Sequence, residues 1–434
     1  MQKLAFALML TLACTAARAE LNIMITQGVD DPIPIAIVPF SWEGDGFLSA
    51  NVAEIVGNDL QQVGEFLALS PSNMLSLPDE EAEVFYRDWR VLAQDYLLVG
   101  KIDRAPGSQL VQVQYEFFDI NRELKLAGEV LTGNVSQLRD IGHEISNVVY
   151  ELVTGTRGAF STQILYITAD QNNDGTTTFR LEKADYDGAR SQVLLESLQP
   201  IMSPNWAPDG QDVAYVSFET DLPRIYIQNI ASGQRRQITN YPNINSSPVF
   251  SPDGTRLAMV LSKDGSPDIY VQDLVSNELI RVTDHPAIDT EPSWSADGES
   301  VVFMSDRTGQ PQIYQMPIGA ASYEVERLTY DCFQCMKAQF LPDGVNLVHV
   351  RRETRQSNYQ IAIANIETLR VITLTDTSLD ESPSVAPNGS MIMYATKVNG
   401  RGVLDAVSID GRVKFRLPST RGDVREPAWS PFFN

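Results

Sequence analysis

Cysteine and histidine are the residue types in this chain that could support redox or metal chemistry. Cys332 and Cys335 form a Cys-x-x-Cys pair, a spacing used by redox-active thiols and by half of many zinc sites. No helical pattern follows Cys335, and the scattered His143, His285 and His349 do not complete a zinc ligand set. The pair therefore favours a local disulfide formed in an oxidising compartment, and we expect no metal and no cofactor.

Calcium binding is a second candidate, because residues 170–175 read Asp-Gln-Asn-Asn-Asp-Gly, like the start of an EF-hand loop. The twelfth position of such a loop is Leu181, where the calcium-binding pattern needs a bidentate glutamate. The flanking segments also have the pattern of strands, whereas an EF-hand loop joins helices. We expect a hairpin loop here, with a calcium-dependent binding module as an alternative.

The second half of the chain is built from a repeated heptapeptide. Its copies are PNWAPDG at 204–210, PVFSPDG at 248–254, PSWSADG at 292–298, AQFLPDG at 338–344, PSVAPNG at 383–389 and PAWSPFF at 427–433. The third positions of these copies are 44, 44, 46, 45 and 44 residues apart, a period typical of four-stranded propeller blades. Six copies predict an all-β six-bladed β-propeller.

Each repeat has the internal pattern of one blade. Asp-Gly or Asn-Gly before an apolar run indicates a tight hairpin between the first two strands, since these residues tolerate positive φ. Turn formation also explains the repeated aspartates without calcium or acid–base chemistry. Ile-Tyr pairs at 225–226, 269–270 and 313–314 mark a third strand, and a fourth strand ends in Thr239, Thr283 and Thr329.

The two ends of the repeat region predict how the ring closes. Residues 163–197 contain three strand patterns with no heptapeptide before them, whereas PAWSPFF at the C-terminus has no blade after it. The C-terminal strand is therefore expected to complete the first blade, because open terminal blades would expose strand edges that soluble β proteins avoid.

Residues 33–158 are expected to form a separate α/β domain ahead of the propeller at 159–434. Strand patterns at 33–40, 96–102, 111–120 and 124–131 alternate with helical patterns at 50–63 and 135–152. His143 falls on the second helix, and we expect it at the surface.

The first 19 residues have the features of a secretory signal peptide. Lys3 precedes a short apolar run, and Ala17-Arg18-Ala19 predicts cleavage between Ala19 and Glu20. Cys14 raises a lipoprotein alternative, but residues 11–13 lack the leucine expected three positions before a lipidated cysteine. No later apolar run approaches the roughly 20 residues of a membrane helix, so we expect a soluble mature chain without membrane insertion.

Net charge limits the classes of partner. The formal charge of −23 becomes −25 once Lys3 and Arg18 leave with the signal peptide. Nucleic acid is excluded as a partner because phosphate binding needs clustered cations. The acidic balance fits a soluble protein with protein partners.

Residues 20–32 precede the α/β domain and contain a short strand pattern. Leu21, Ile23 and Ile25 alternate with other residues, and glycine, aspartate and proline then end the pattern. A free strand of this kind can add to the sheet of another protein. It can equally pair within its own domain.

Several stretches outside the generic repeats carry a family resemblance. They are QGVDDPIPIAIVPF, LVTGTRGAFSTQILY, ADYDG, PIMSPNWAPDG, LDESPSVAPNGSMIMYATK and DGRVKFRLPSTRGDVREPAWSPFF. With these, the chain resembles the TolB family, the periplasmic propeller components of the Tol-Pal envelope system, over essentially its whole mature length. The resemblance implies a non-enzymatic periplasmic protein that supports outer-membrane invagination during cell division and outer-membrane integrity.

The resemblance also implies two protein partners. The peptidoglycan-associated lipoprotein Pal would bind the mouth of the propeller channel, where the spacing places the residues just before each heptapeptide. We expect a monomer that binds Pal through Met202, Asn245, Ser247, Thr290, Glu291, Asp380, Glu381 and Arg425. The C-terminal domain of TolA would bind the N-terminal segment, through Glu20, Leu21, Asn22, Ile23, Met24 and Ile25. Members of the family often carry a histidine beside the position of Asn245, where this chain has Ile244.

An enzyme is the remaining alternative, since propellers also host quinone-dependent sugar dehydrogenases and accompany prolyl peptidases. The chain has no Gly-x-Ser-x-Gly nucleophile motif, and its histidines fall in a helix, a loop and a strand without evident convergence. We therefore expect no enzymatic activity.

Overall fold

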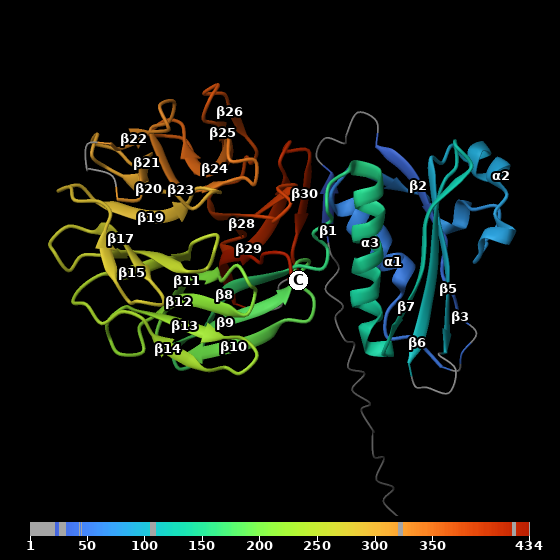
Figure 1. Ribbon diagram of the computed structural model, residues 1–434, viewed down its shortest axis with the longest axis horizontal. Coiled ribbons are helices and arrows are strands. Elements are labelled where there is room, and N and C mark those ends of the chain that lie inside the picture. Colours follow the sequence, from blue (N-terminus) through green and yellow to red (C-terminus); the bar gives the residue numbers. More distant parts are fainter. Residues whose placement is uncertain are drawn as a thin grey trace, which may run out of the picture.

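The computed structural model describes residues 22–25, 32–42, 44, 46–104, 110–319, 324–418 and 422–433. An α/β part stands beside a six-bladed β-propeller, so the predicted fold class is confirmed (Figure 1). The predicted signal peptide and its cleavage site between Ala19 and Glu20 lie outside the described residues. Among the described helices, none is both long and apolar enough to cross a bilayer.

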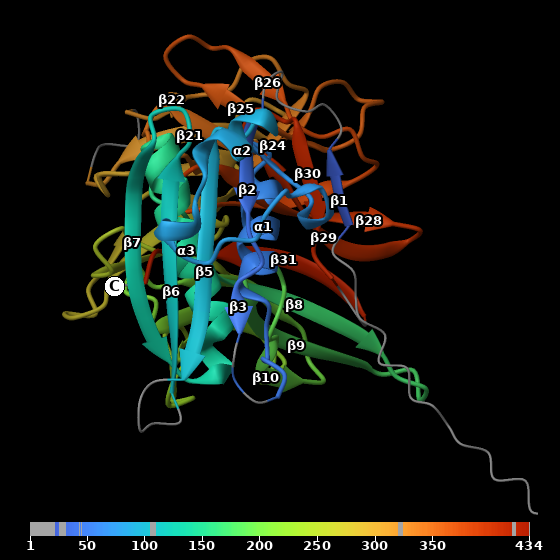
Figure 2. The ribbon, with the colours of Figure 1, turned by 90° about the vertical axis from the view of Figure 1, so that its right-hand side faces the viewer.

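The α/β part is a mixed sheet with its two long helices on one face. The strand order is β4 (Phe66–Ala68), β2 (Ile33–Ile37), β5 (Tyr96–Arg104), β6 (Val111–Asp119) and β7 (Leu124–Gly133), with β3 (Ser41–Trp42) beside β5. Helices α1 (Val52–Gln62) and α3 (Leu138–Thr154) pack on one face, and the short α2 (Tyr86–Val91) packs on the other (Figure 2). Single 3₁₀ turns are η1 (Pro71–Asn73), η2 (Glu81–Glu83) and η3 (Val135–Gln137).

Local sequence explains where the long helices begin and end. The Asn51 side chain accepts the backbone N–H of Glu54 and so caps α1. Asn134 and Gln137 form a capping box at η3, so the helix predicted from residue 135 begins as a 3₁₀ turn and continues as α3. Gly155 ends α3 in the left-handed region, at φ 76°.

The prediction that His143 lies at the surface is wrong. Its side chain is buried, and its Nδ1 lies 2.8 Å from Oδ2 of Asp59 in α1. The Tyr186 hydroxyl, from the propeller, donates to Oδ1 of the same carboxylate at 2.6 Å. Burial alone would lower the pKa of His143, but the charge and hydrogen bond of Asp59 outweigh burial and raise it. His143 therefore belongs to an interdomain cluster, defined as Asp59, His143, Ser146 and Tyr186.

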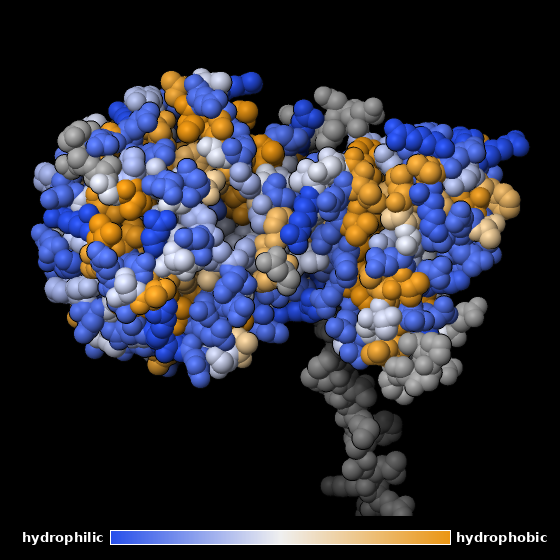
Figure 3. Space-filling view, viewed as in Figure 1, coloured by the Kyte–Doolittle hydropathy of each residue, from blue (hydrophilic) through white to orange (hydrophobic). Residues whose placement is uncertain are grey.

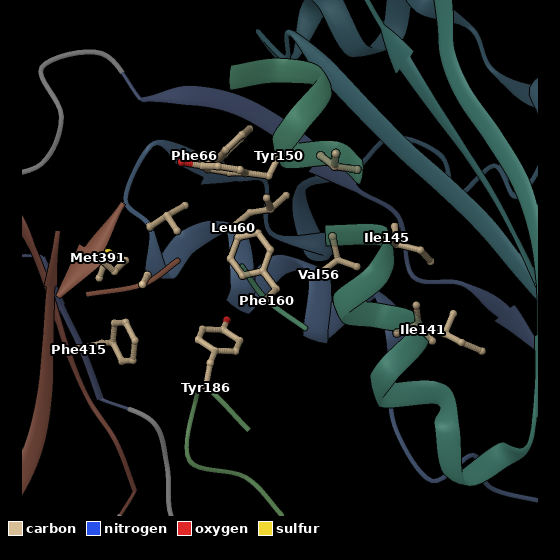
Figure 4. Close-up of a cluster of buried hydrophobic side chains, with 14 of the residues drawn as sticks. Val56, Leu60, Phe66, Ile141, Ile145, Tyr150, Phe160, Tyr186, Met391 and Phe415 are labelled. Carbon is tan, nitrogen blue, oxygen red and sulfur yellow. The ribbon is translucent and has the colours of Figure 1, made fainter. Parts of the chain in front are cut away.

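The apolar core is continuous across the two parts. In Figure 4, side chains of α1 and α3 face Phe160, Tyr186, Met391 and Phe415 of the propeller. Figure 3 shows that the outer surface around this junction is mainly hydrophilic. The two parts therefore share buried apolar surface, which favours a fixed relative orientation.

The propeller consists of six sheets of four strands each, one of which gains a fifth. Blades 1 to 3 are β10-β9-β8-β31 (Gln192–Ser197, Thr177–Asp185, Gln163–Gln171, Asp423–Trp429), β11-β12-β13-β14 (Ile201–Trp206, Asp212–Ser217, Arg224–Asn229, Arg235–Gln237) and β15-β16-β17-β18 (Asn245–Phe250, Arg256–Leu261, Asp268–Asp273, Leu279–Arg281). Blades 4 to 6 are β19-β20-β21-β22 (Asp289–Trp294, Ser300–Ser305, Gln312–Pro317, Glu326–Arg327), β23-β24-β25-β26 (Gln334–Phe340, Asn346–Arg352, Gln360–Asn365, Val371–Thr373) and β27-β28-β29-β30 (Asp380–Val385, Met391–Val398, Arg401–Ser408, Val413–Arg416).

The ring closes as predicted. The C-terminal strand β31 pairs antiparallel with β8, so that Trp429 lies opposite Ile164 and Arg425 opposite Ile167. The Trp429 indole N–H also donates to the Thr162 hydroxyl at 2.8 Å. The first blade is thus completed by the last strand of the chain.

The heptapeptide repeats because it joins neighbouring blades. Trp206 Nε1 donates to the carbonyl of Ala428 at 3.0 Å, and Trp294 Nε1 donates to the carbonyl of Val249 at 3.1 Å. Each of these bonds runs from one blade to the preceding one. The turn glycines also need their positive φ, as at Gly254 with φ 71°, where the Pro208 ring of the preceding blade lies beside the missing Cβ.

Candidate functional site: the channel mouth

Every blade carries the same irregularity in its innermost strand, immediately before the first residue of the heptapeptide. At this point the pairing with the next strand shifts by a β-bulge. The bulged residue adopts a left-handed φ between 49° and 54°, at Ser203, Ser247, Glu291, Lys337, Ser382 and Glu426. None of these is glycine, and such backbone costs about 1–3 kcal/mol per residue, so its sixfold recurrence marks a feature of the fold.

The bulged residues and the heptapeptides line the central channel of the propeller. The channel has a volume of about 490 Å³ and is lined by side chains from residues 203–208, 247–252, 291–296, 337–342, 382–387 and 426–431. We call the end where the innermost strands begin the mouth, and the end at the Asp-Gly turns the far end. The bulges therefore place a ring of six side chains just inside the mouth.

Two glutamates of this ring accept hydrogen bonds from the next blade. Glu291 Oε2 accepts the backbone N–H of Lys337 at 2.9 Å, and Glu426 Oε2 accepts the backbone N–H of Ser203. Lys337 Nζ then donates to the Ser382 hydroxyl at 2.8 Å. Burial raises the pKa of Glu291, with Lys337 opposing the shift and Glu426 adding to it. The ring is polar and rigidly bonded, which suits a preorganised docking rim.

The structure brings the predicted Pal-binding residues to one mouth but places them at different depths. The exposed members are Met202, Glu381 and Arg425, and the half-buried members are Ser247, Thr290 and Glu291. Asn245 and Asp380 are fully buried. Side chains at these two positions therefore lie beneath the rim.

The two buried residues shape the loops that support the rim. The Asn245 amide donates to the carbonyls of Tyr241 and Asn243 at 2.8 and 3.2 Å. Asp380 accepts from the Thr377 hydroxyl, and burial raises its pKa. Both side chains thus act on the mouth through the conformation of the loops that precede β15 and β27.

Cys332, in the loop between blades 4 and 5, and Cys335, near the start of β23, form a disulfide with a sulfur–sulfur distance of 2.10 Å. In the Asp170–Gly175 hairpin, Asp170 pairs with Arg180 at 2.5 Å and Asp174 accepts from Thr176. The described residues contain no group of three or more histidine, cysteine or acidic side chains that could hold a metal ion.

The N-terminal strand lies on the propeller. β1 (Asn22–Ile25) pairs antiparallel with β30 and becomes the fifth strand of blade 6, with Asn22 opposite Arg416 and Ile25 opposite Val413. Pairing within the α/β domain, one of the two sequence-based alternatives, is therefore wrong. Glu20 and Leu21 lie outside the described residues.

Sequence reasoning missed contacts that join distant segments. The interdomain cluster combines α1, α3 and the ADYDG stretch at 184–188, and Tyr186 is 127 residues from Asp59. The bulge residues Ser203, Lys337, Ser382 and Glu426 were also absent from the predicted Pal set. Their signal was available, because each directly precedes the first residue of its heptapeptide.

Comparison with known proteins covers almost the whole chain. Residues 21–126 match the family described as TolB amino-terminal domain, and residues 150–433 match that described as TolB beta propeller domain. The Tol-Pal system protein TolB of Pseudomonas fluorescens is 51% identical over 423 residues, covering 98% of this chain and 97% of that protein. Its counterpart from Pseudomonas syringae pv. tomato is 51% identical over 422 residues, covering 96% of each.

A solved structure agrees with these sequence matches. The crystal structure of TolB from Acinetobacter baumannii superposes with a TM-score of 0.86 at 37% identity, covering 95% of this chain and all 100% of that one. Both domains, their order and the six-bladed ring are thus shared with proteins of one family. The chain belongs to the TolB family of Tol-Pal system proteins.

Proposed function

We propose that this protein is a non-enzymatic periplasmic adaptor with two binding surfaces. Pal binds the channel mouth, and the C-terminal domain of TolA binds the N-terminal segment at residues 20–25. Through these contacts the protein supports outer-membrane invagination during division and outer-membrane integrity. Family membership supports the assignment, since the relatives named above are Tol-Pal system proteins.

The ring of bulged residues at the mouth is the observation that carries the Pal assignment. Its polar groups lie beside exposed Met202, which directly precedes Ser203 and whose flexible side chain adapts to a partner surface. Glu291 belongs to this ring and Thr290 directly precedes it, and both are half-buried. A docking rim of this kind needs no pocket for a small substrate.

The pairing of β1 with β30 supports the TolA assignment. β1 is a terminal strand held at a sheet edge by backbone pairing, and such a strand can leave that edge and add to another sheet. The segment would thus exchange between its own propeller and TolA.

Burial of two of the three histidines supports the absence of catalysis. Among the described residues, His143 and Asp59 form a buried pair with side chains 3% and 2% exposed. His349 is fully buried in β24. A substrate could not reach either imidazole without unfolding of its surroundings.

The test is a pair of titrations with the mature chain, residues 20–434, against the soluble domain of its cognate Pal and the C-terminal domain of TolA. Deletion of residues 20–25 should abolish TolA binding and leave Pal binding intact. Loss of both, or retention of both, would contradict the assignment of separate surfaces.

A further inference from the structure

The channel mouth is nearly sixfold symmetric in its backbone, so a partner docked on it needs an asymmetric feature to fix its rotation about the channel axis. The six bulges have φ values within 5° of one another, since they span 49° to 54°. The inner strands of blades 2 to 4 are six residues long. These blades therefore present similar rims.

Blades 6 and 1 break this symmetry at the mouth. The strands β28 and β29 have eight residues each, and β8 and β9 have nine. In blade 6, Thr396 of β28 pairs with Asp380 at the start of the inner strand, and β28 continues past this pair to Val398. In blade 1, Thr168 of β8 pairs with Val424 near the start of the inner strand, and β8 continues past this pair to Gln171. Two to three residues per strand add about 7–10 Å, so these two hairpins project above the rim. Their tips lie on the same side of the molecule in Figure 2.

Specific contacts hold the two projecting hairpins against β31. Arg401 Nε donates to the carbonyl of Gly422 at 2.7 Å, and the backbone N–H of Gly402 donates to Asp423 Oδ1 at 2.8 Å. A Cβ on Gly402 would lie 2.8 Å from the Val424 carbonyl oxygen, and one on Gly422 would lie 2.4 Å from Oδ1 of Asp170. The two hairpins therefore form a fixed wall beside the mouth. Binding of a partner needs little further ordering of these hairpins, which lowers its entropy cost.

Between the two hairpins lies a cleft of about 610 Å³, lined by Ala169, Gln171, Thr177, Phe179, Arg401, Gly422, Asp423 and Arg425. A smaller hollow of about 160 Å³ adjoins it and adds Lys397 and Glu381. Arg425 lines both, and it also belongs to the innermost strand that leads into the mouth. The cleft is therefore continuous with the mouth surface.

The charge of the cleft differs from that of the whole molecule. The chain has 56 acidic and 33 basic residues. The two hollows instead present Lys397, Arg401 and Arg425 against the carboxylates of Asp423 and Glu381. Asp423 is engaged by Gly402, and its contact with Arg425 is long, at 3.9 Å, with both side chains about half exposed. Arg425 thus presents a cationic group to a ligand at the foot of the wall, with Lys397 lining the adjoining hollow.

We propose that this cleft receives an acidic segment of the partner docked at the mouth, and that this contact fixes the partner's rotation about the channel axis. The inference rests on the proposed function, with Pal as that partner. Charge complementarity at a rim acts mainly on the rate and orientation of association. Removing positive charge from the cleft should therefore slow association with Pal and weaken its salt dependence.

The experiment measures association of the mature chain with the soluble domain of its cognate Pal across a series of salt concentrations. Arg425→Glu should slow association roughly tenfold at low salt and flatten the salt dependence. Asp423→Asn, which keeps an oxygen for the Gly402 N–H, should act in the opposite direction and speed association. Arg370→Glu makes the same charge change on an exposed residue at the far end of the propeller and should leave the rate unchanged.

The outcomes separate this inference from the proposed function. If the wild-type chain binds Pal and both cleft variants associate at the wild-type rate, the cleft is not the contact and the inference fails alone. If Arg370→Glu slows association as much as Arg425→Glu, overall charge explains the effect and the inference also fails. If the wild-type chain does not bind Pal, the proposed function fails, and this occupant of the cleft fails with it.

Discussion

Single side chains set the pH response of this protein, and His349 is the clearest case. It is fully buried in β24, and burial lowers its pKa to about 4 from an ordinary value of 6.5. The unfolded chain therefore binds a proton at this residue between these pH values, and the folded chain does not. Its contribution to stability is present above about pH 6.5 and is lost as the pH falls toward 4.

The variant His349→Leu should remove this part of the acid dependence. By linkage the wild-type loss from this residue is up to about 3 kcal/mol, and chemical unfolding at a series of pH values measures it. Val350→Leu, a change of a buried apolar residue in the same strand, is the control and should keep the wild-type acid profile. An unchanged acid profile in His349→Leu would contradict this account.

Which residues lie exposed at the mouth could be predicted only in part. The repeat spacing placed Met202, Thr290 and Glu291 at the mouth. Of these, Glu291 lines the channel, and Met202 and Thr290 each directly precede a bulged residue in the same strand. The sequence could not show that Asn245 and Asp380 are buried, because burial depends on how the assembled blades pack around them. The sequence pattern placed His143 at the surface and could not reveal its partner Asp59, because the two residues lie 84 positions apart in the chain.

At the level of elements, the ADYDG loop joins the propeller to α3. Arg139 of α3 binds Asp185 at 3.0 Å and also binds Asp187, on either side of Tyr186. Tyr186 itself donates into the interdomain cluster, where Asp59 also accepts from the Ser146 hydroxyl at 2.6 Å. This loop therefore fixes the position of the α/β domain on blade 1.

Tyr186→Phe should weaken that junction without changing either domain. A hydrogen bond to a charged group contributes about 1.5–3 kcal/mol, so amide hydrogen exchange in α3 should accelerate and the melting temperature should fall. Tyr330→Phe is the matched control, because the Tyr330 hydroxyl bonds to the carbonyl of Arg327, three residues away in the sequence. Equal effects of the two variants would contradict an interdomain role for Tyr186.

The C-terminal strand is the second element with a global effect. Deletion of residues 427–434 removes the end of β31 that pairs with β8, together with the Trp429 side chain. Because the ring is continuous, we expect the whole propeller to melt at a lower temperature. Trp429→Ala should reproduce part of the effect, at about 3–5 kcal/mol. Unchanged melting of the deletion variant would refute closure of the ring by β31.

Helices and strands could be predicted from the sequence better than contacts between distant segments, because their signals are local. Heptapeptide spacing, turn glycines and apolar alternation are local signals, and they predicted the six blades, the closing strand and the two long helices. The repeated threonines gave a further signal, since the Thr239 and Thr283 hydroxyls accept the N–H of Ile225 and Ile269. The docking of β1 on β30 had no local signal, because a free edge in blade 6 follows only from the assembled ring.

At the scale of the whole molecule, the two proposed binding surfaces meet in blade 6. Its inner strand β27 contributes to the mouth, and its outer strand β30 pairs with β1. β30 also touches the α/β domain, because Gly64 at the end of α1 packs directly on Val413. A ligand at the mouth could therefore change how firmly β1 is held.

Coupling between the surfaces predicts reciprocal affinities. Pal should change the affinity of the chain for TolA by some factor, and TolA should change the affinity for Pal by the same factor. Calorimetric titration of each partner with and without saturating amounts of the other measures both factors. Identical TolA affinities with and without Pal would end the idea of coupling.

The central claim is that this protein binds Pal at the channel mouth, and calorimetric titration of residues 20–434 with the soluble domain of its cognate Pal tests it most directly. Met202→Ala shortens an exposed apolar side chain at the mouth, and Val275→Ala does so in a far-end turn, where the wild-type residue is 84% exposed. We predict saturable binding that Met202→Ala weakens and Val275→Ala does not. Absence of binding by the wild-type chain, or equal binding by the two variants, would contradict the claim.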